Sequence, residues 1–143
     1  MNLNKLSNIE IYGDINYRGD CPAEGIEQTT AISRIRREYP QSLGLLVLHP
    51  RNEGKRRFSQ AAKEKAQGLT PGASDIVIPA NPAFVCEIKR RDHTKSTITP
   101  EQIRYLNAAQ SAGCFACVAL GADAVMLAIH DFMAIHAVSF PRQ

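Results

Sequence analysis

The chain has 143 residues, 44% of them hydrophobic, which suffices for one core and is too short to divide comfortably into two domains. It has no apolar run as long as a membrane span, and its polar start lacks the apolar segment of a signal peptide, so we expect a soluble, cytoplasmic protein. Seventeen Lys and Arg against fourteen Asp and Glu give a net charge of +3, which by itself excludes no class of partner.

The basic residues are unevenly distributed along the chain. They gather in Arg34–Arg37, in Arg51–Arg57, at Lys63 and Lys65, and in Lys89–Lys95, while the last part of the chain is poor in them. Such clustering fits a surface that contacts a polyanion, and it also fits ordinary solvated faces of helices and loops.

The first half of the chain predicts a helix and a strand after an N-terminal arm. In this arm, residues 1–21, only Ile9–Tyr12 has strand character. Residues recur at helical spacing through Ala23–Glu38, and Tyr39-Pro40 ends this predicted helix. The continuous apolar run Leu43–His49, bounded by Pro50, predicts a buried strand.

The second half predicts a short helix and a hairpin. Ser59–Gln67 is rich in Ala and Lys, has no β-branched residue and is followed by Gly68, as is typical of a short helix. Asp75–Ile78 and Phe84–Lys89 have strand character, and the five residues between them favour a hairpin.

The chain then returns to helix, strand and helix. Thr99 as N-cap and Pro100 at the first helical position begin a helix that Gly113 ends. Phe115–Leu120 predicts a further strand, and Ala122 to about His136 a final amphipathic helix. This order predicts an α/β fold, a single domain over 22–143 with a mixed central sheet flanked by helices.

Cysteine and histidine give little sign of a metal site. Cys114 and Cys117 have C-x-x-C spacing, but residues three apart on a strand point to opposite faces, so they would not converge on one ion. Buried thiols in a reducing compartment are the simpler interpretation, with zinc or a redox pair as the alternative. No ligand spacing relates the histidines His49, His93, His130 and His136.

The predicted hairpin brings two acids together. If it turns about Asn81, Asp75 lies directly opposite Glu87, with the Cβ atoms about 5 Å apart on one face of the sheet. Lys89, two residues beyond Glu87, shares that face. The alternative interpretation is that Glu87-x-Lys89 lies on a solvated face of a strand. The apolar residues beside both acids instead indicate interior strands, where burial of an unpaired acid costs free energy.

Two carboxylates this close need a compensating cation. At an effective dielectric near 20 they repel by roughly 3 kcal/mol, and a divalent metal would offset this repulsion. Hard oxygen ligands with room for water favour Mg²⁺ or Mn²⁺ over zinc. Such a metal lowers the pKa of a bound water and polarises a phosphate, and Lys89 would hold the water or pair with a phosphate oxygen.

These motifs resemble those of a known superfamily. Gly72-Ala73-Ser74-Asp75, followed by Glu87-Ile88-Lys89, resembles the PD-(D/E)XK nuclease signature with its restriction-endonuclease-like core. The wider order resembles the VRR-NUC subgroup, in particular its stand-alone phage and prophage members, over residues 22–135. The residues that carry this likeness are Glu24 with Gln28, the loop Asn52–Arg56, Gly72 with Asp75, Glu87 with Lys89, and Gln102. Two departures are Ser74 in place of Pro, and Lys89-Arg90-Arg91 in place of Val-Arg-Arg.

The resemblance implies a metal-dependent DNA endonuclease that cuts branched DNA, such as junctions or flaps, as a homodimer. A non-catalytic nucleic-acid-binding or scaffold protein is the alternative, although degenerate members typically lose the Asp, the Glu or the Lys, and all three are present. A sequence-specific restriction enzyme is disfavoured, since no recognition module fits. The implied catalytic residues are Glu24, Asp75, Glu87, Lys89 and Gln102, the metal ligands Glu24, Asp75, Glu87 and Ile88, and the DNA contacts Arg51, Asn52, Lys55, Arg56, Arg90 and Arg91.

Two of these assignments have alternatives in the local sequence. Gln102 also fits a capping box with Thr99, so its role is either structural or in the site. Glu24 lies on the same helical stripe as Ala31 and Ile35, and we expect this stripe to face the sheet. The alternative role of Glu24 is a favourable interaction of its charge with the positive end of the helix dipole. Glu27 falls on a polar stripe that we expect to face water.

Overall fold

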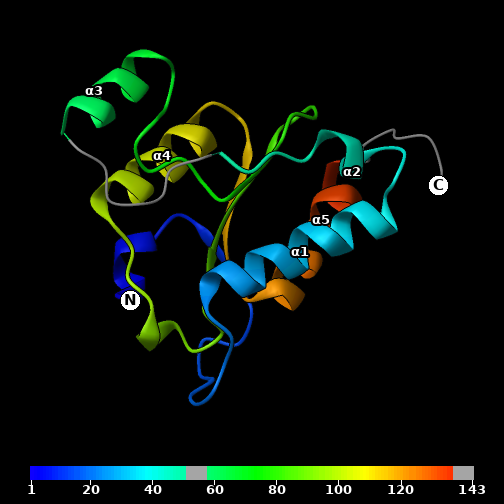
Figure 1. Ribbon diagram of the computed structural model, residues 1–143. Helices are drawn as coiled ribbons and strands as arrows, with labels where there is room; N and C mark the ends of the chain where they lie inside the picture. The colour runs from blue at the N-terminus through cyan, green and yellow to red at the C-terminus, as the bar shows by residue number, and fades with distance from the viewer. Residues whose placement is uncertain (51–57, 137–143) are drawn as a thin grey trace.

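The computed structural model describes residues 1–50 and 58–136 and contains a four-stranded mixed sheet (Figure 1). The strand order is β1-β4-β3-β2; β1 and β3 run parallel to β4, and β2 is antiparallel to β3. The strands are β1 (Glu10–Tyr12), β2 (Ile76–Ile78), β3 (Phe84–Lys89) and β4 (Phe115–Leu120). This architecture, with helices on both faces, confirms the predicted α/β fold.

Helices cover the two faces of the sheet. The α-helices are α1 (Glu24–Glu38), α2 (Leu43–Leu46), α3 (Phe58–Ala66), α4 (Pro100–Ser111) and α5 (Ala122–His136), and two 3-10 turns span Leu3–Leu6 (η1) and His93–Lys95 (η2). Helices α1 and α5 lie together on one side of the sheet, with α4 on the other (Figure 1). No helix among the described residues is long and apolar enough to cross a membrane.

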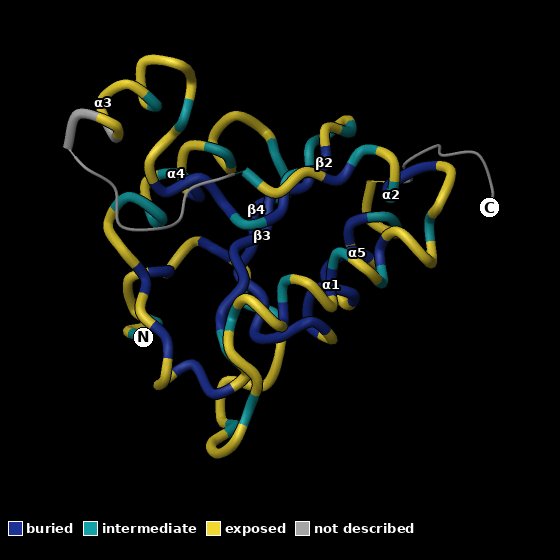
Figure 2. Tube along the Cα trace, viewed as in Figure 1, coloured by how far each residue is buried: buried dark blue, intermediate teal, exposed yellow. Residues whose placement is uncertain are grey.

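Strand β3 is buried along its whole length, and its side chains alternate between two core clusters, one on each face of the sheet. Phe84, Cys86 and Ile88 pack into the cluster under α1 and α5, whereas Val85 packs into the cluster under α4. Figure 2 shows burial concentrated along β3 and β4. Because side chains alternate on a strand, Glu87 and Lys89 emerge on the α4 side with Val85.

The strand predicted over Leu43–His49 is wrong. Leu43–Leu46 forms α2, and Leu43 and the following Val47 pack in the core under α1. Val47 is extended, and Leu48 forms an isolated bridge to Val77. Gly44 makes this packing feasible, since a Cβ there would lie 2.7 Å from the Tyr39 carbonyl oxygen. A short apolar run does not distinguish a buried strand from a buried helical turn. The remaining predicted elements are confirmed to within one or two residues.

The N-terminal arm belongs to the same sheet. The predicted strand at Ile9–Tyr12 is present as β1, which pairs with β4, and the Met1 amino group donates a hydrogen bond to the His93 carbonyl oxygen at 3.0 Å. The boundary proposed at residue 21 stays a prediction about domain limits.

Candidate active site

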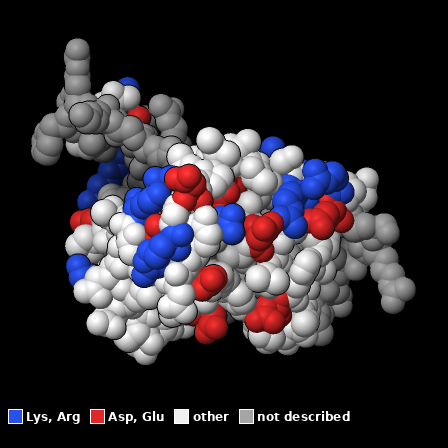
Figure 3. Space-filling view, turned by 90° about the horizontal axis from the view of Figure 1, so that it is seen from below, with Lys and Arg blue, Asp and Glu red and all other residues white. Residues whose placement is uncertain are grey.

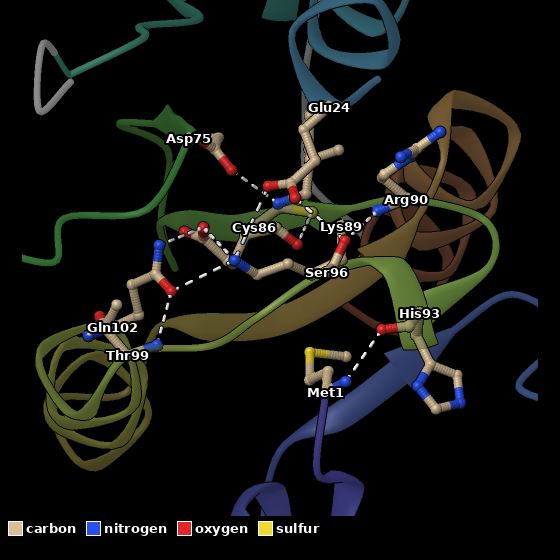
Figure 4. Close-up of polar contacts among 12 residues, drawn as sticks. Met1, Glu24, Asp75, Cys86, Lys89, Arg90, His93, Ser96, Thr99 and Gln102 are labelled. Carbon is tan, nitrogen blue, oxygen red and sulfur yellow. Dashed lines mark hydrogen bonds and ion pairs between the residues drawn. The ribbon is translucent and has the colours of Figure 1, made fainter. Parts of the chain in front are cut away.

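The hairpin has the predicted register. The paired residues are Ile76 with Cys86, Val77 with Val85 and Ile78 with Phe84, so the next position places Asp75 opposite Glu87. Asp75 Oδ2 accepts a hydrogen bond of 2.8 Å from the amide of Ile88, which holds its carboxylate against β3 (Figure 4).

Gly72 brings the Asp75 loop against the start of α4. Its φ of +78° lies in the left-handed region, and a Cβ there would sit 2.3 Å from the Glu101 carbonyl carbon and 2.7 Å from the Gln102 nitrogen. Only glycine permits this approach without a shift of main chain. The loop that carries Asp75 and the helix that carries Gln102 therefore meet at this point.

Glu87 is a buried acid with one unpartnered oxygen. It is 2% exposed; its Oε1 accepts from Gln102 Nε2 at 2.9 Å, while Oε2 has no hydrogen-bond partner within the described structure. Burial raises the pKa of Glu87 well above its usual range, the negative charge of Asp75 raises it further, and the ammonium of Lys89 opposes both. A buried oxygen without a partner costs free energy, and a bound cation would remove that cost.

Lys89 supplies a buried positive charge beside this acid. It is 2% exposed, and its Nζ donates to Gln102 Oε1 at 3.2 Å. The same Nζ lies 3.5 Å from Glu87 Oε1 and 3.8 Å from Glu24 Oε1. A buried ammonium is tolerated only with partners of this kind.

The sequence left two roles open for Gln102, a helix cap and a place in the site, and its side chain has the contacts of both. Thr99 Oγ1 accepts from the Gln102 amide at 3.1 Å and Gln102 Oε1 accepts from the Thr99 amide at 3.0 Å, which completes a capping box. The side-chain amide of the same residue contacts Glu87 and Lys89. The cap therefore fixes the rotamer that bridges the two charged groups.

Glu24 reaches the site from the first residue of α1. Its Oε2 accepts from Ser96 Oγ at 2.9 Å, and its side chain remains 40% exposed. The hydroxyl of Ser96, which is buried, in turn accepts from the Arg90 amide at 3.0 Å. Ser96 thus connects the main chain just after β3 to Glu24, a role that no local sequence signal indicates.

The expectation that Glu27 faces water is wrong. Glu27 is 6% exposed, and its Oε2 accepts from the amide of Ala122 at 2.9 Å, at the start of α5. An acid at this position satisfies an otherwise unpaired amide and interacts well with the positive end of α5. The buried stripe of α1 is Glu27, Ala31 and Ile35, at steps of four residues, and that spacing was the available signal.

Comparison with solved structures finds a similar architecture. A VRR_NUC domain protein aligns with a TM-score of 0.65 over 82% of this chain and 92% of that chain, at 24% sequence identity. The chain has a VRR_NUC-type fold. No protein-family model matches the sequence, and no similar protein was found among curated proteins. The functional assignment therefore depends on the site residues.

Within this fold, the oxygen ligands suit a hard divalent cation. The described residues contain no group of three His, Cys, Asp or Glu side chains placed to hold a metal ion. Asp75 and Glu87 nevertheless form a pair with a buried unpartnered oxygen, and Mg²⁺ is typically bound by one or two carboxylates plus waters. Ile88 has a hydrocarbon side chain in the core, so it would contribute only its main-chain oxygen.

The candidate DNA-contacting arginines differ in their surroundings. Arg90 donates from Nη2 to the Cys21 carbonyl at 2.6 Å and from Nε to the Pro22 carbonyl at 3.1 Å, so it ties down the segment before α1. Arg91 is exposed, with its guanidinium carbon 4.6 Å from the centroid of the Tyr17 ring. On the face drawn in Figure 3, basic groups alternate with acidic ones. Arg51, Asn52, Lys55 and Arg56 lie outside the described residues.

The two thiols at C-x-x-C spacing do not converge. Cys114 and Cys117 pack in different core clusters, as expected from their spacing on opposite faces, and Cys117 pairs instead with Cys86 across neighbouring strands. The hydrogen bond with Cys117, together with burial, raises the pKa of the Cys86 thiol well above its usual range. All four cysteines are free thiols.

Proposed function

We propose that the protein is a Mg²⁺- or Mn²⁺-dependent endonuclease that hydrolyses phosphodiester bonds in DNA. The observation that carries this proposal is the buried, partly unpartnered carboxylate of Glu87 between Asp75 and Lys89. A site that only stabilised the fold would be expected to satisfy such a group internally. The fold shared with a VRR_NUC domain protein supports the same conclusion.

Asp75 and Glu87 would hold the cation, with the Ile88 main-chain oxygen and Glu24 as further ligands. A divalent cation there activates water for attack and neutralises charge on the phosphate. Lys89 has three donors, and its contacts with Gln102 and Glu87 fix Nζ at the edge of the acidic pair. This ammonium is placed to hold the attacking water or a phosphate oxygen, while the half-exposed Glu24 carboxylate keeps the site open to solvent.

The proposal is tested by incubating the protein with linear, nicked, flapped and four-way DNA in Mg²⁺, in Mn²⁺ and in EDTA. We expect cleavage with either metal, none in EDTA, and preference for the flapped or four-way substrates. Binding to these DNAs without cleavage in any metal would contradict the proposal and favour a nucleic-acid-binding scaffold.

We also propose that the active form is a homodimer. Opposed cuts in two strands of a junction need two sets of acids, and the described part of one chain holds one Asp75–Glu87 pair. Light scattering should give twice the 15.7 kDa mass of a single chain. A species of one chain mass that still makes paired cuts would contradict the dimer.

The substitution Glu24→Gln is expected to lower the cleavage rate at least tenfold, about 1.4 kcal/mol of barrier, with little change in melting temperature. Gln keeps an acceptor for Ser96 Oγ but loses the charge near Lys89. Glu27→Ala is the matched control on the same helix. It removes the partner of the Ala122 amide, so it should lower stability by about 1 kcal/mol and leave the rate of the folded protein near wild type. Unaltered cleavage by the Glu24 variant would remove this residue from the site.

A further inference from the structure

A concave surface lies on the α1 side of the molecule, and one of its lining residues, His49, contacts the main chain of Asp75. It is a groove of about 440 Å³, and its lining carries hydroxyl, amide, imidazole and guanidinium groups and one hydrocarbon side chain. The lining residues are Gln28, Thr29, Ile32, Ser33, Arg36 and His49. None of them is acidic, in contrast to the acidic pair next to the groove.

The groove is fixed in place relative to Asp75. His49 Nδ1 lies 2.8 Å from the Asp75 carbonyl oxygen, and because a carbonyl only accepts, Nδ1 is the donor. The neighbouring Leu48 exchanges two main-chain hydrogen bonds with Val77, of 2.8 and 3.0 Å. Gln28, which also lines the groove, lies one helical turn beyond Glu24.

The charge in the groove comes from Arg36. The nearby Arg34 is paired with Asp123 at 2.6 Å, whereas Arg36 is exposed and has no ion-pair partner in the described parts of the chain. A guanidinium in this state is suited to a phosphate, which it can bind through two parallel hydrogen bonds.

The polar stripe of α1 has the length of a short run of nucleotides. Thr29, Ser33 and Arg36 follow one another at steps of four and three residues, so they share a helix face. At 1.5 Å of rise per residue, this stripe is about 10 Å long. One strand of duplex DNA presents a phosphate about every 3.4 Å of helix axis, so a stripe that lies along this axis would span about three phosphates.

We propose that this groove binds the sugar–phosphate backbone of one DNA strand as that strand leads away from the scissile bond. The inference rests on the proposed function, since it places the groove beside the acids that cut. It also gives a role to Arg36, one of the clustered basic residues that the catalytic site leaves unused.

Two adjacent arginines give a matched test of the charge. Arg36 and Arg37 are both exposed in the last turn of α1, and only Arg36 lines the groove. Binding of a fluorescein-labelled flap duplex is measured by anisotropy in EDTA over a series of NaCl concentrations. Arg36→Ala should weaken binding at least fivefold and make the slope of log K against log salt less negative by about 0.9, the value for one lost phosphate contact. Arg37→Ala should change affinity less than twofold.

Bulky substitutions at two adjacent threonines test whether filling the groove blocks binding of a DNA strand. Thr29 and Thr30 are both exposed, and each hydroxyl donates to the carbonyl four residues earlier, at 3.0 and 2.9 Å. Only Thr29 lines the groove, so Thr29→Tyr should block a strand and weaken binding, while Thr30→Tyr should not. Melting temperatures of both variants should match the wild type.

The outcomes separate this inference from the proposed function. If the wild type binds and cuts DNA but the members of each pair behave alike, only the groove assignment is overturned. If the two variants within each pair differ in DNA binding as expected but no metal supports cleavage, DNA binding by the groove is supported and the nuclease proposal is wrong. If the wild type binds no DNA, both proposals are overturned.

Discussion

Asp75→Asn is expected to reduce the rate of DNA cleavage at least a thousandfold, about 4 kcal/mol of barrier. Asparagine has nearly the same shape and keeps a carbonyl oxygen for the Ile88 amide, which now donates to Asp75 at 2.8 Å. It lacks the negative charge that a divalent cation requires from its ligands. Single-turnover cleavage of a flap duplex in Mg²⁺ measures the loss, and the melting temperature should change little because Asp75 is only partly buried.

Asp123→Asn is the control for this substitution. Asp123 is exposed and pairs with Arg34 at the surface, where an ion pair contributes little. Its cleavage rate should stay within about twofold of wild type. An Asp75→Asn variant that cuts at the wild-type rate would show that the Asp75–Glu87 pair is not the metal site.

Lys89→Met is expected to abolish cleavage and also to destabilise the protein. The lysine is buried, and methionine replaces its hydrocarbon stem while removing the only ammonium within 4 Å of Glu87 among the described residues. Removing one member of a buried ion pair typically costs about 3 to 5 kcal/mol. Here protonation of Glu87 would reduce that cost, because burial already raises the pKa of its carboxyl.

The double variant Glu87→Gln with Lys89→Met separates stability from chemistry. Without either charge the site no longer contains an unpaired buried ion, so the melting temperature should recover relative to Lys89→Met while cleavage stays absent. Recovery of cleavage in the double variant, or a Lys89→Met protein that cuts normally, would contradict the role of the ammonium.

The hairpin was predictable because its determinants are local. The five-residue connection centred on Asn81 defines the register, and the period of two places Glu87 and Lys89 on one face. The capping box of Gln102 was local as well. The contact of its amide with Glu87 joins residues 15 apart, so it depends on how α4 packs on β3.

The predictions were wrong where the local sequence fits two conformations or two environments equally well and tertiary contacts select one of them. Leu43–Leu46 is apolar in either conformation, and its packing against α1 selects the helix. Glu27 is buried because the start of α5 needs an acceptor, 95 residues away in sequence. Ser96 was missed for the same reason, as its bond to Glu24 spans 72 residues.

The most direct test of the metal site is anomalous diffraction from crystals of the wild-type protein grown with Mn²⁺. We predict a manganese peak in contact with a carboxylate oxygen of Asp75 and with Oε2 of Glu87, the oxygen that has no hydrogen-bond partner within residues 1–50 and 58–136. A well-ordered site with both carboxylates in place and no manganese peak between them, or a peak bound only elsewhere, would contradict the account.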